Sequence, residues 1–136
     1  MRRGTGGIVT AMRLVLDTDP QILTVRRYGA GEIEVAGQVL TAPCILSPAR
    51  LITDWAVSTA ADLDEAALAP LLALRPAVVL IGSDAREAGG TLAGGALRRR
   101  VEARGVSLEW MSLGAACRTY NVLAQERREV VAGLFP

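Results

Sequence analysis

The chain has 136 residues, 51% of them hydrophobic and 21% charged, and a formal net charge of +1, which is typical of one domain with a hydrophobic core. The near-neutral charge and the aromatic fraction of 4% argue against nucleic acid as a partner, because such binding uses basic patches and aromatic stacking. All 15 basic residues are arginine and histidine is absent, which excludes Schiff-base lysines, phosphate-loop lysines, histidine general bases and histidine metal sites.

The ends and the cysteines of the chain set further expectations. Residues 1–13 carry arginines and glycines with no apolar signal region, so we expect a flexible N-terminal tail before a single α/β domain over residues 14–136. No segment approaches the roughly 20 apolar residues that span a bilayer, and we expect a cytoplasmic protein with no membrane span. Cys44 and Cys117 are too few for a disulfide scaffold or a cysteine zinc site. We expect free thiols, no metal and no cofactor.

The first half of the chain has the pattern of antiparallel strands. Over residues 22–40, apolar residues alternate with polar ones between glycine turns, which predicts a small meander of hairpins. The apolar residues 43–46 predict one further short strand. Residues 51–57 have no clear period; we expect them to place Trp55 on the core, and their exposed parts are candidate contacts for a homo-oligomer.

The second half alternates predicted helices and strands. Residues 62–65 carry an N-terminal capping pattern, and leucines follow at helical spacing, so we expect a helix that Pro70 kinks or restarts. The β-branched run at residues 77–81 predicts a strand buried on both faces. A helix over residues 95–104 and a strand over 106–111 complete a strand-helix-strand unit, which predicts parallel strands and a right-handed crossover. A helix over residues 115–127 then leads into a final apolar strand over 130–135.

One edge of the predicted sheet is the expected ligand site, because ligands of open α/β sheets bind at the carboxyl ends of the strands. If the strands that end at Ile81 and Met111 are parallel neighbours, the residues that follow them lie together. We assign no catalytic residue. The expected ligand-binding cleft contains Ser83, Asp84, Ser112, Gly114, Ala115, Ala116, Cys117, Arg118 and Asn121.

The start of the helix after Gly114 is the best single candidate within this cleft. The first amides of a helix and the positive end of its dipole favour an anion. Arg118, Asn121 and Gln125 form a polar stripe on the same helix. This stripe either holds an anion, contacts a partner or faces solvent.

Cys117 has two interpretations. Near a helix start and beside Arg118, it has the setting of an activated thiol, whose base would be a carboxylate such as Asp84. Alternatively, it shares a helical stripe with Tyr120 and Ala124, which is the pattern of a buried packing residue.

Residues 114–123, Gly-Ala-Ala-Cys-Arg-Thr-Tyr-Asn-Val-Leu, resemble a segment of the domain-of-unknown-function family numbered 498. The resemblance extends over residues 14–134 and includes residues 28–33, Pro48, Trp55 and residues 78–82. It implies a three-layer α/β domain with a mixed central β-sheet, and it brings no established catalytic residues. The mitochondrial relatives of this family imply a helper in assembling respiratory NADH dehydrogenase. Residues 82–84 depart from the family pattern, with Gly-Ser-Asp in place of Gly-Thr-Gly.

Two functions are compatible with these observations. The first is a non-enzymatic protein-interaction or assembly factor with an unidentified protein partner, because the chain lacks most catalytic bases and carries an arginine on its candidate helix face. The alternative is a small-anion or metabolite binding domain, or a weak enzyme. In that case Arg118 and the amides of residues 115–117 would hold a carboxylate or phosphate.

Overall fold

The first strands of the chain form a small antiparallel sheet. The computed structural model describes residues 12–13, 21–84 and 92–136. In spatial order, the strands of this sheet are β1 (Met12–Arg13), β2 (Val25–Gly29), β3 (Glu32–Val35) and β4 (Gln38–Leu40). Two-residue turns at positive φ, Ala30-Gly31 and Ala36-Gly37, join β2 to β3 and β3 to β4. The predicted hairpin region is therefore confirmed.

The expected N-terminal tail falls mostly outside this description. Residues 1–11 lie outside the described residues. At the end of the expected tail, Met12–Arg13 pair with Tyr28 and Arg27 of β2.

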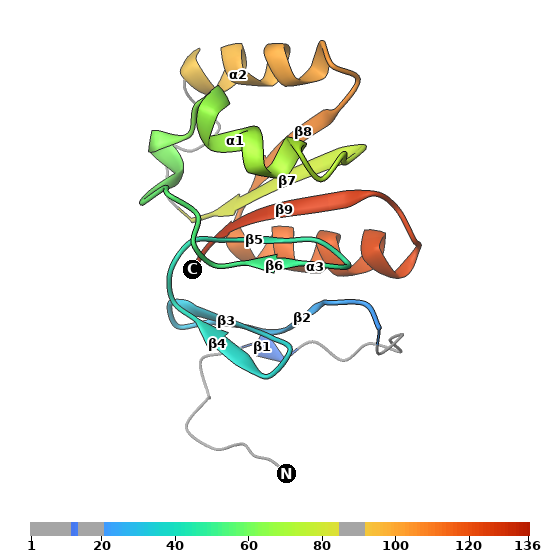
Figure 1. The fold of residues 1–136 in the computed structure, drawn as a ribbon. Coiled ribbons are helices and arrows are strands. Elements are labelled where there is room, and N and C mark those ends of the chain that lie inside the picture. The colour runs from blue at the N-terminus through green and yellow to red at the C-terminus, as the bar shows by residue number, and fades with distance from the viewer. Residues whose placement is uncertain (1–11, 14–20, 85–91) are drawn as a thin grey trace.

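A five-stranded mixed sheet forms the centre of the domain (Figure 1). In spatial order, its strands are β6 (Leu51–Ile52), β5 (Cys44–Leu46), β9 (Val130–Phe135), β7 (Val78–Ser83) and β8 (Ser107–Met111). β7 pairs in parallel with both β8 and β9, whereas β5 pairs antiparallel with β9 and β6. The predicted parallel neighbours are confirmed, since Ile81 pairs with Trp110 and Gly82 with Met111.

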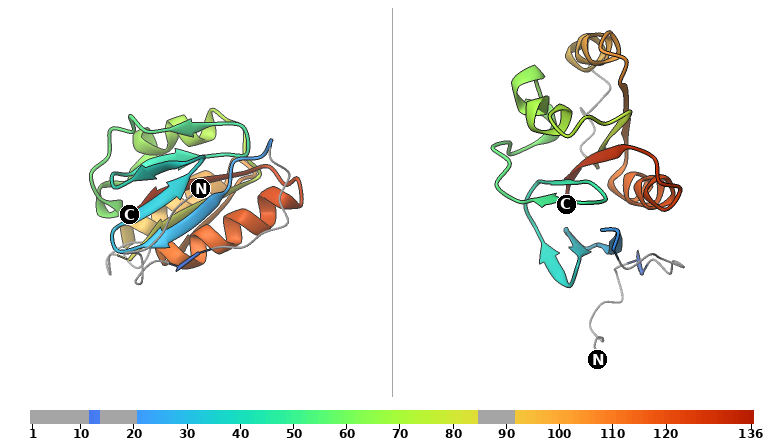
Figure 2. Two further views of the ribbon diagram at one scale, coloured as in Figure 1. Left: turned by 90° about the horizontal axis from the view of Figure 1, so that it is seen from below. Right: turned by 45° about the vertical axis from the view of Figure 1, so that its right-hand side comes forward.

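Helices complete the three layers. α1 (Glu65–Leu72) and α2 (Leu92–Glu102) lie over one face of the central sheet, whereas α3 (Leu113–Gln125) and the small sheet cover the other face (Figures 1 and 2). α2 connects β7 to β8 and α3 connects β8 to β9, so the two crossovers leave the sheet on opposite faces. Within the described ranges, no helix is long and apolar enough to cross a membrane.

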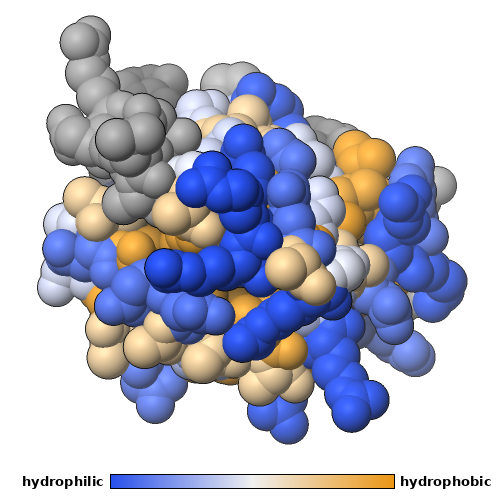
Figure 3. All heavy atoms as spheres, turned by 90° about the horizontal axis from the view of Figure 1, so that it is seen from above, coloured by the Kyte–Doolittle hydropathy of each residue, from blue (hydrophilic) through white to orange (hydrophobic). Residues whose placement is uncertain are grey.

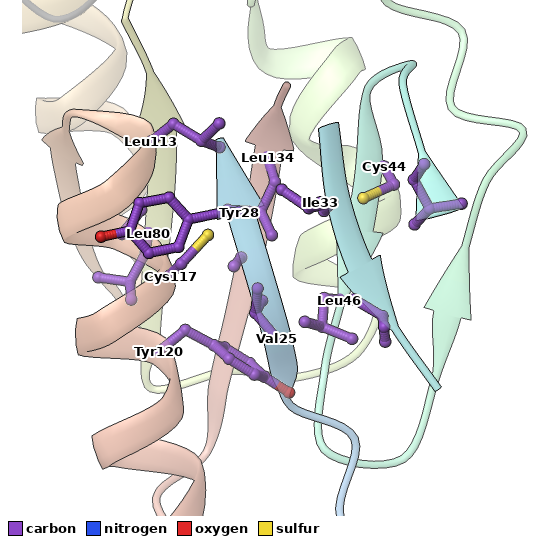
Figure 4. Close-up of a cluster of buried hydrophobic side chains, with 14 of the residues drawn as sticks. Val25, Tyr28, Ile33, Cys44, Leu46, Leu80, Leu113, Cys117, Tyr120 and Leu134 are labelled. Atoms are coloured by element: carbon purple, nitrogen blue, oxygen red, sulfur yellow. The ribbon is translucent and has the colours of Figure 1, made fainter. Parts of the chain in front are cut away.

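Alternation along the central strands divides the core into two clusters. Val79 and Ile81 pack on the side of α1 and α2, together with Trp55. Leu80 packs on the other side, in the cluster that joins the central sheet to α3 and the small sheet (Figure 4). Burial on both faces explains why β7 is an uninterrupted apolar run. Trp55 is therefore on the core, as predicted.

The helix ends differ in part from the predictions. Asp64 caps α1 by accepting a hydrogen bond from the Ala67 amide at 2.8 Å, as the capping pattern indicated. α1 does not restart at Pro70 but continues to Leu72, because a proline so near the helix end removes only one backbone hydrogen bond. A 3-10 turn, η1 (Ala60–Asp62), precedes α1 and was not predicted. α2 and α3 begin earlier than predicted.

Candidate functional site

The carboxyl ends of β7 and β8 form a topological switch point. The helices that follow these neighbouring strands, α2 and α3, lie on opposite faces of the sheet (Figure 1). Such divergence opens a crevice at the strand ends, where ligands of α/β proteins bind. In this protein the crevice is bridged, because the Leu113 amide donates a hydrogen bond to Asp84 Oδ1 at 3.0 Å.

Groups of the chain itself bond the Leu113, Ala115 and Ala116 amides in the first turn of α3. Ser112 is the N-cap, and its hydroxyl accepts from the Ala115 amide at 3.2 Å. The Ser112 carbonyl accepts from the Ala116 amide at 2.9 Å. Together with the Asp84 carboxylate on the Leu113 amide, these contacts occupy part of the helix start at which we predicted an external anion. The Ala115 and Ala116 amides thus bond within the chain, and ligand binding at this helix start stays a prediction.

Cys117 is fully buried and packs in the cluster between α3 and the small sheet (Figure 4). Burial, reinforced by the neighbouring Cys44, raises the pKa of Cys117 to about 12, and the opposing effect of Arg118 is smaller. Burial likewise raises the pKa of Cys44 to about 12. A thiol is a nucleophile only as thiolate, so this environment favours the packing interpretation over the activated thiol.

We expect neither thiol of the folded protein to react with a colorimetric thiol reagent at about pH 8, because both stay protonated and buried. Unfolding in urea should expose both thiols to the reagent. Since the folded-state pKa lies above the ordinary 9.0, the associated stability is complete below pH 9.0 and is lost as the pH rises towards 12. Rapid reaction of the native protein that Cys117→Ser abolishes would instead identify an activated thiol.

Asn121 is not on a solvated face, which corrects its place in the predicted polar stripe. Its side chain is 1% exposed and lies between α3 and β2. Asn121 Oδ1 accepts from the Val25 amide at 2.9 Å, and Asn121 Nδ2 donates to the Val25 carbonyl at 2.8 Å. The carboxamide thus takes the place of a neighbouring strand at Val25. The hydroxyl of the preceding residue, Tyr120, donates to the Leu23 carbonyl at 2.8 Å.

Tyr28 and Arg118 form the polar rim of the site. The Arg118 guanidinium donates a hydrogen bond to the Tyr28 hydroxyl, and its carbon lies 5.9 Å from the centre of the Tyr28 ring. Figure 4 shows Tyr28 reaching from β2 towards α3. The ring packs on Gly114 so closely that an added Cβ there would lie 2.7 Å from Tyr28 Cε1. Because Gly114 has no side chain, the Tyr28 ring can pack this closely on α3.

An open cleft of about 510 Å³ lies beside this rim. Of the predicted site residues, Ser83, Asp84 and Gly114 line it. Ser112 and Arg118 are exposed nearby, Ala115 is half-buried, and Ala116, Cys117 and Asn121 are in the core. The remaining lining residues were not predicted. They are Tyr28, Gly29, Ala30, Gly31, Ser58, Thr59, Ala60, Leu113, Phe135 and Pro136.

For some of the lining residues that were not predicted, the sequence did contain a signal. Residues 28–31, Tyr-Gly-Ala-Gly, belong to the segments that carry the family resemblance, and in the structure they form the β2–β3 turn beside the cleft. The pattern of residues 58–60 contained no corresponding signal. Only the tertiary structure brings both segments to the ends of β7 and β9.

Known proteins are similar to this chain in architecture and in sequence. A mouse protein, NADH dehydrogenase [ubiquinone] 1 alpha subcomplex assembly factor 3, is 24% identical over 127 residues, which are 93% of this chain and 68% of the mouse protein. The crystal structure of a Bordetella parapertussis protein is 33% identical, with a TM-score of 0.75 over 88% of this chain and 99% of that one. A solution structure from Bordetella pertussis, described as an Mth938-like domain, is 29% identical, with a TM-score of 0.73 over 92% of each chain. A family model described as protein of unknown function (DUF498/DUF598) matches residues 25–135, and the chain belongs to this family.

Proposed function

We propose that the protein is a non-enzymatic, assembly-factor-type domain of the cytoplasm, which binds a partner protein through the cleft and the adjoining face of α3. The observation that carries this proposal is that side chains of the protein itself accept hydrogen bonds from the amides at the start of α3. Asp84 and Ser112 occupy the first amides of α3, and Cys117 is buried and protonated. The group left exposed beside this helix start is Arg118, and arginine is a residue type enriched where proteins recognise partners.

The outer face of α3 has the chemistry of a protein interface. Arg118 is exposed, and Val122, one turn later, is 51% exposed. Arginine and tyrosine are enriched at interfaces, where an apolar neighbour adds buried area. A partner segment with a carboxylate for Arg118 and an apolar side chain for Val122 fits this surface.

The likeness to the mouse protein supports this proposal at the level of an assembly role. By its name, that relative is an assembly factor of NADH dehydrogenase. We propose subunits of respiratory NADH dehydrogenase, or the machinery that assembles them, as the class of partner for this chain.

Affinity purification of the tagged protein with quantitative mass spectrometry tests the proposal. We expect Arg118→Glu and Val122→Asp each to lower recovery of the specific partner at least tenfold, since the first reverses a charge in the interface and the second introduces one. The matched controls are Arg100→Glu on α2 and Val39→Asp on β4, which are exposed elsewhere. Circular dichroism checks that all variants are folded. Equal recovery with all four variants would contradict the proposed surface.

A metabolite-binding domain or weak enzyme is the second candidate, favoured by the volume of the cleft. About 510 Å³ lies within the range of small-molecule sites. Asp84 lines this cleft, so its ligand would present a hydrogen-bond donor or a positive charge there. A bait without partners, together with a ligand that raises the melting temperature of the protein but not of an Asp84→Ala variant, would favour this candidate.

A further inference from the structure

A second pocket, of about 320 Å³, lies at the opposite end of the central sheet from the cleft. Three connections meet there: the β5–β6 turn, the α1–β7 connection and the α3–β9 connection, all at the right-hand side of Figure 1. The lining residues from these connections, with the first residues of β9, are Ser47, Pro48, Ala49, Arg50, Leu74, Arg75, Pro76, Arg128, Glu129, Val130 and Val131.

The pocket concentrates positive charge. Arg50, Arg75 and Arg128 line it, and Glu129 is the one acidic residue among its lining. These residues carry a formal charge of +2, more than the +1 of the whole chain. In the described part of the chain, none of the three arginines of the pocket takes part in an ion pair.

The backbone that carries these arginines is held in place. In the β5–β6 turn, the Arg50 amide donates to Ser47 Oγ at 3.0 Å, and the Ser47 amide donates to the Arg50 carbonyl at 2.8 Å. The Arg128 amide donates to the Leu123 carbonyl at 2.9 Å. The Glu129 carbonyl accepts from the Ala77 amide at 2.8 Å, which joins the two other connections.

Arg75 occupies a position that favours glycine. Its φ is 57°, three residues after Leu72 at the end of α1, and its amide donates to the Leu72 carbonyl at 3.0 Å. Glycine adopts this left-handed conformation without strain at a helix end, whereas arginine does not. The strained residue here is one of the three arginines that line the pocket, and strain of this kind collects at functional sites.

We propose that this pocket binds a small anion with at least two negative charges, bearing phosphate or carboxylate groups. Guanidinium forks match both groups, because each presents paired N–H donors to paired oxygens. Pro48, Leu74 and Pro76 provide an apolar wall for the organic part of the ligand. The site is separate from the proposed protein interface, so either can fail without the other.

Titration of the ¹⁵N-labelled protein by NMR tests the site, with inorganic phosphate and citrate as probes and sodium chloride at equal ionic strength as the control. We expect saturable shifts of the amides of Ser47, Arg75 and Glu129. Arg75→Gly and Arg128→Gln should each raise the dissociation constant at least fivefold. Arg100→Gln, an exposed arginine of α2, should leave it within twofold.

Arg75→Gly separates loss of the ligand from loss of the fold. Since glycine relieves the left-handed backbone, this variant should melt at or above the temperature of the parent while it binds the anion less tightly. Saturation by phosphate alone or by citrate alone would support the site and identify the ligand group. Shifts that do not saturate and equal those with chloride, or full affinity in both Arg75→Gly and Arg128→Gln, would overturn the proposal.

Discussion

Replacing Asn121 by alanine is expected to lower the free energy of unfolding by about 3 kcal/mol, because two buried backbone groups lose their partners at once. The carboxamide bonds both the amide and the carbonyl of Val25, at 2.9 and 2.8 Å, and is 1% exposed. Alanine leaves these groups with neither a strand nor water. Urea unfolding followed by circular dichroism gives the change as a shift in midpoint at constant slope.

Two further variants make this result specific. Val122→Ala, at the exposed neighbouring position, should change the free energy of unfolding by less than about 0.5 kcal/mol. Asn121→Asp keeps an acceptor for the Val25 amide but loses the donor and buries a carboxylate, so it should destabilise at least as much as alanine at neutral pH. A loss below about 1 kcal/mol in Asn121→Ala would mean that this contact does not hold α3 to β2.

Replacing Gly82 by alanine should also lower the free energy of unfolding by about 3 kcal/mol, in this case because the added methyl group overpacks the core. Gly82 lies in β7 where α3 crosses the sheet. An added Cβ would lie 2.5 Å from Ala116 Cβ and 3.2 Å from Leu134 Cδ2. The nearest obstacle belongs to the helix, so α3 must move away from the sheet. The same urea measurement reports the loss.

The matched control for this prediction is Gly95→Ala in α2. Among the described residues, a Cβ at Gly95 would meet only Arg99 Nη1, at 3.9 Å, so this variant should be more stable by about 0.5 to 1 kcal/mol through helix propensity. Ala116→Gly removes the nearest obstacle, and the double variant with Gly82→Ala should be less destabilised than the sum of the two single changes. Strict additivity would show that Ala116 is not what excludes the methyl group.

Most of the fold could be predicted from local patterns. The glycine turns after β2 and β3, the run of β7 and the last strand over residues 130–135 were all visible in the sequence. Parallel pairing of β7 with β8 followed from the strand-helix-strand order, because such crossovers join parallel strands. The antiparallel pairing of β5 with β9, which places Cys44 beside Leu134, could not be predicted. No local pattern specifies a neighbouring strand so distant in sequence.

The candidate site was predicted less completely than the fold. The cleft lies at the ends of β7 and β9 beside the start of α3, and of the predicted site residues Ser83, Asp84 and Gly114 line it. That a ligand binds there stays a prediction. The periodicity of α3 correctly grouped Cys117 with Tyr120 as packing residues, and all three members of that stripe are buried. The same periodicity placed Asn121 on a polar face, whereas its side chain is buried. The sequence shows that asparagine can form hydrogen bonds, but it does not show with which groups.

By itself, the sequence determined the elements, the two apolar faces of the central sheet and the absence of lysine and histidine chemistry. These are properties of composition and of short periods, which act within a single strand or helix. Only the tertiary structure decided that Asp84 occupies the start of α3, that Asn121 completes β2 and that three arginines share one pocket. The contacts of Asp84 and Asn121 join residues 29 and 96 positions apart, and all three arrangements exist only once packing brings distant segments together.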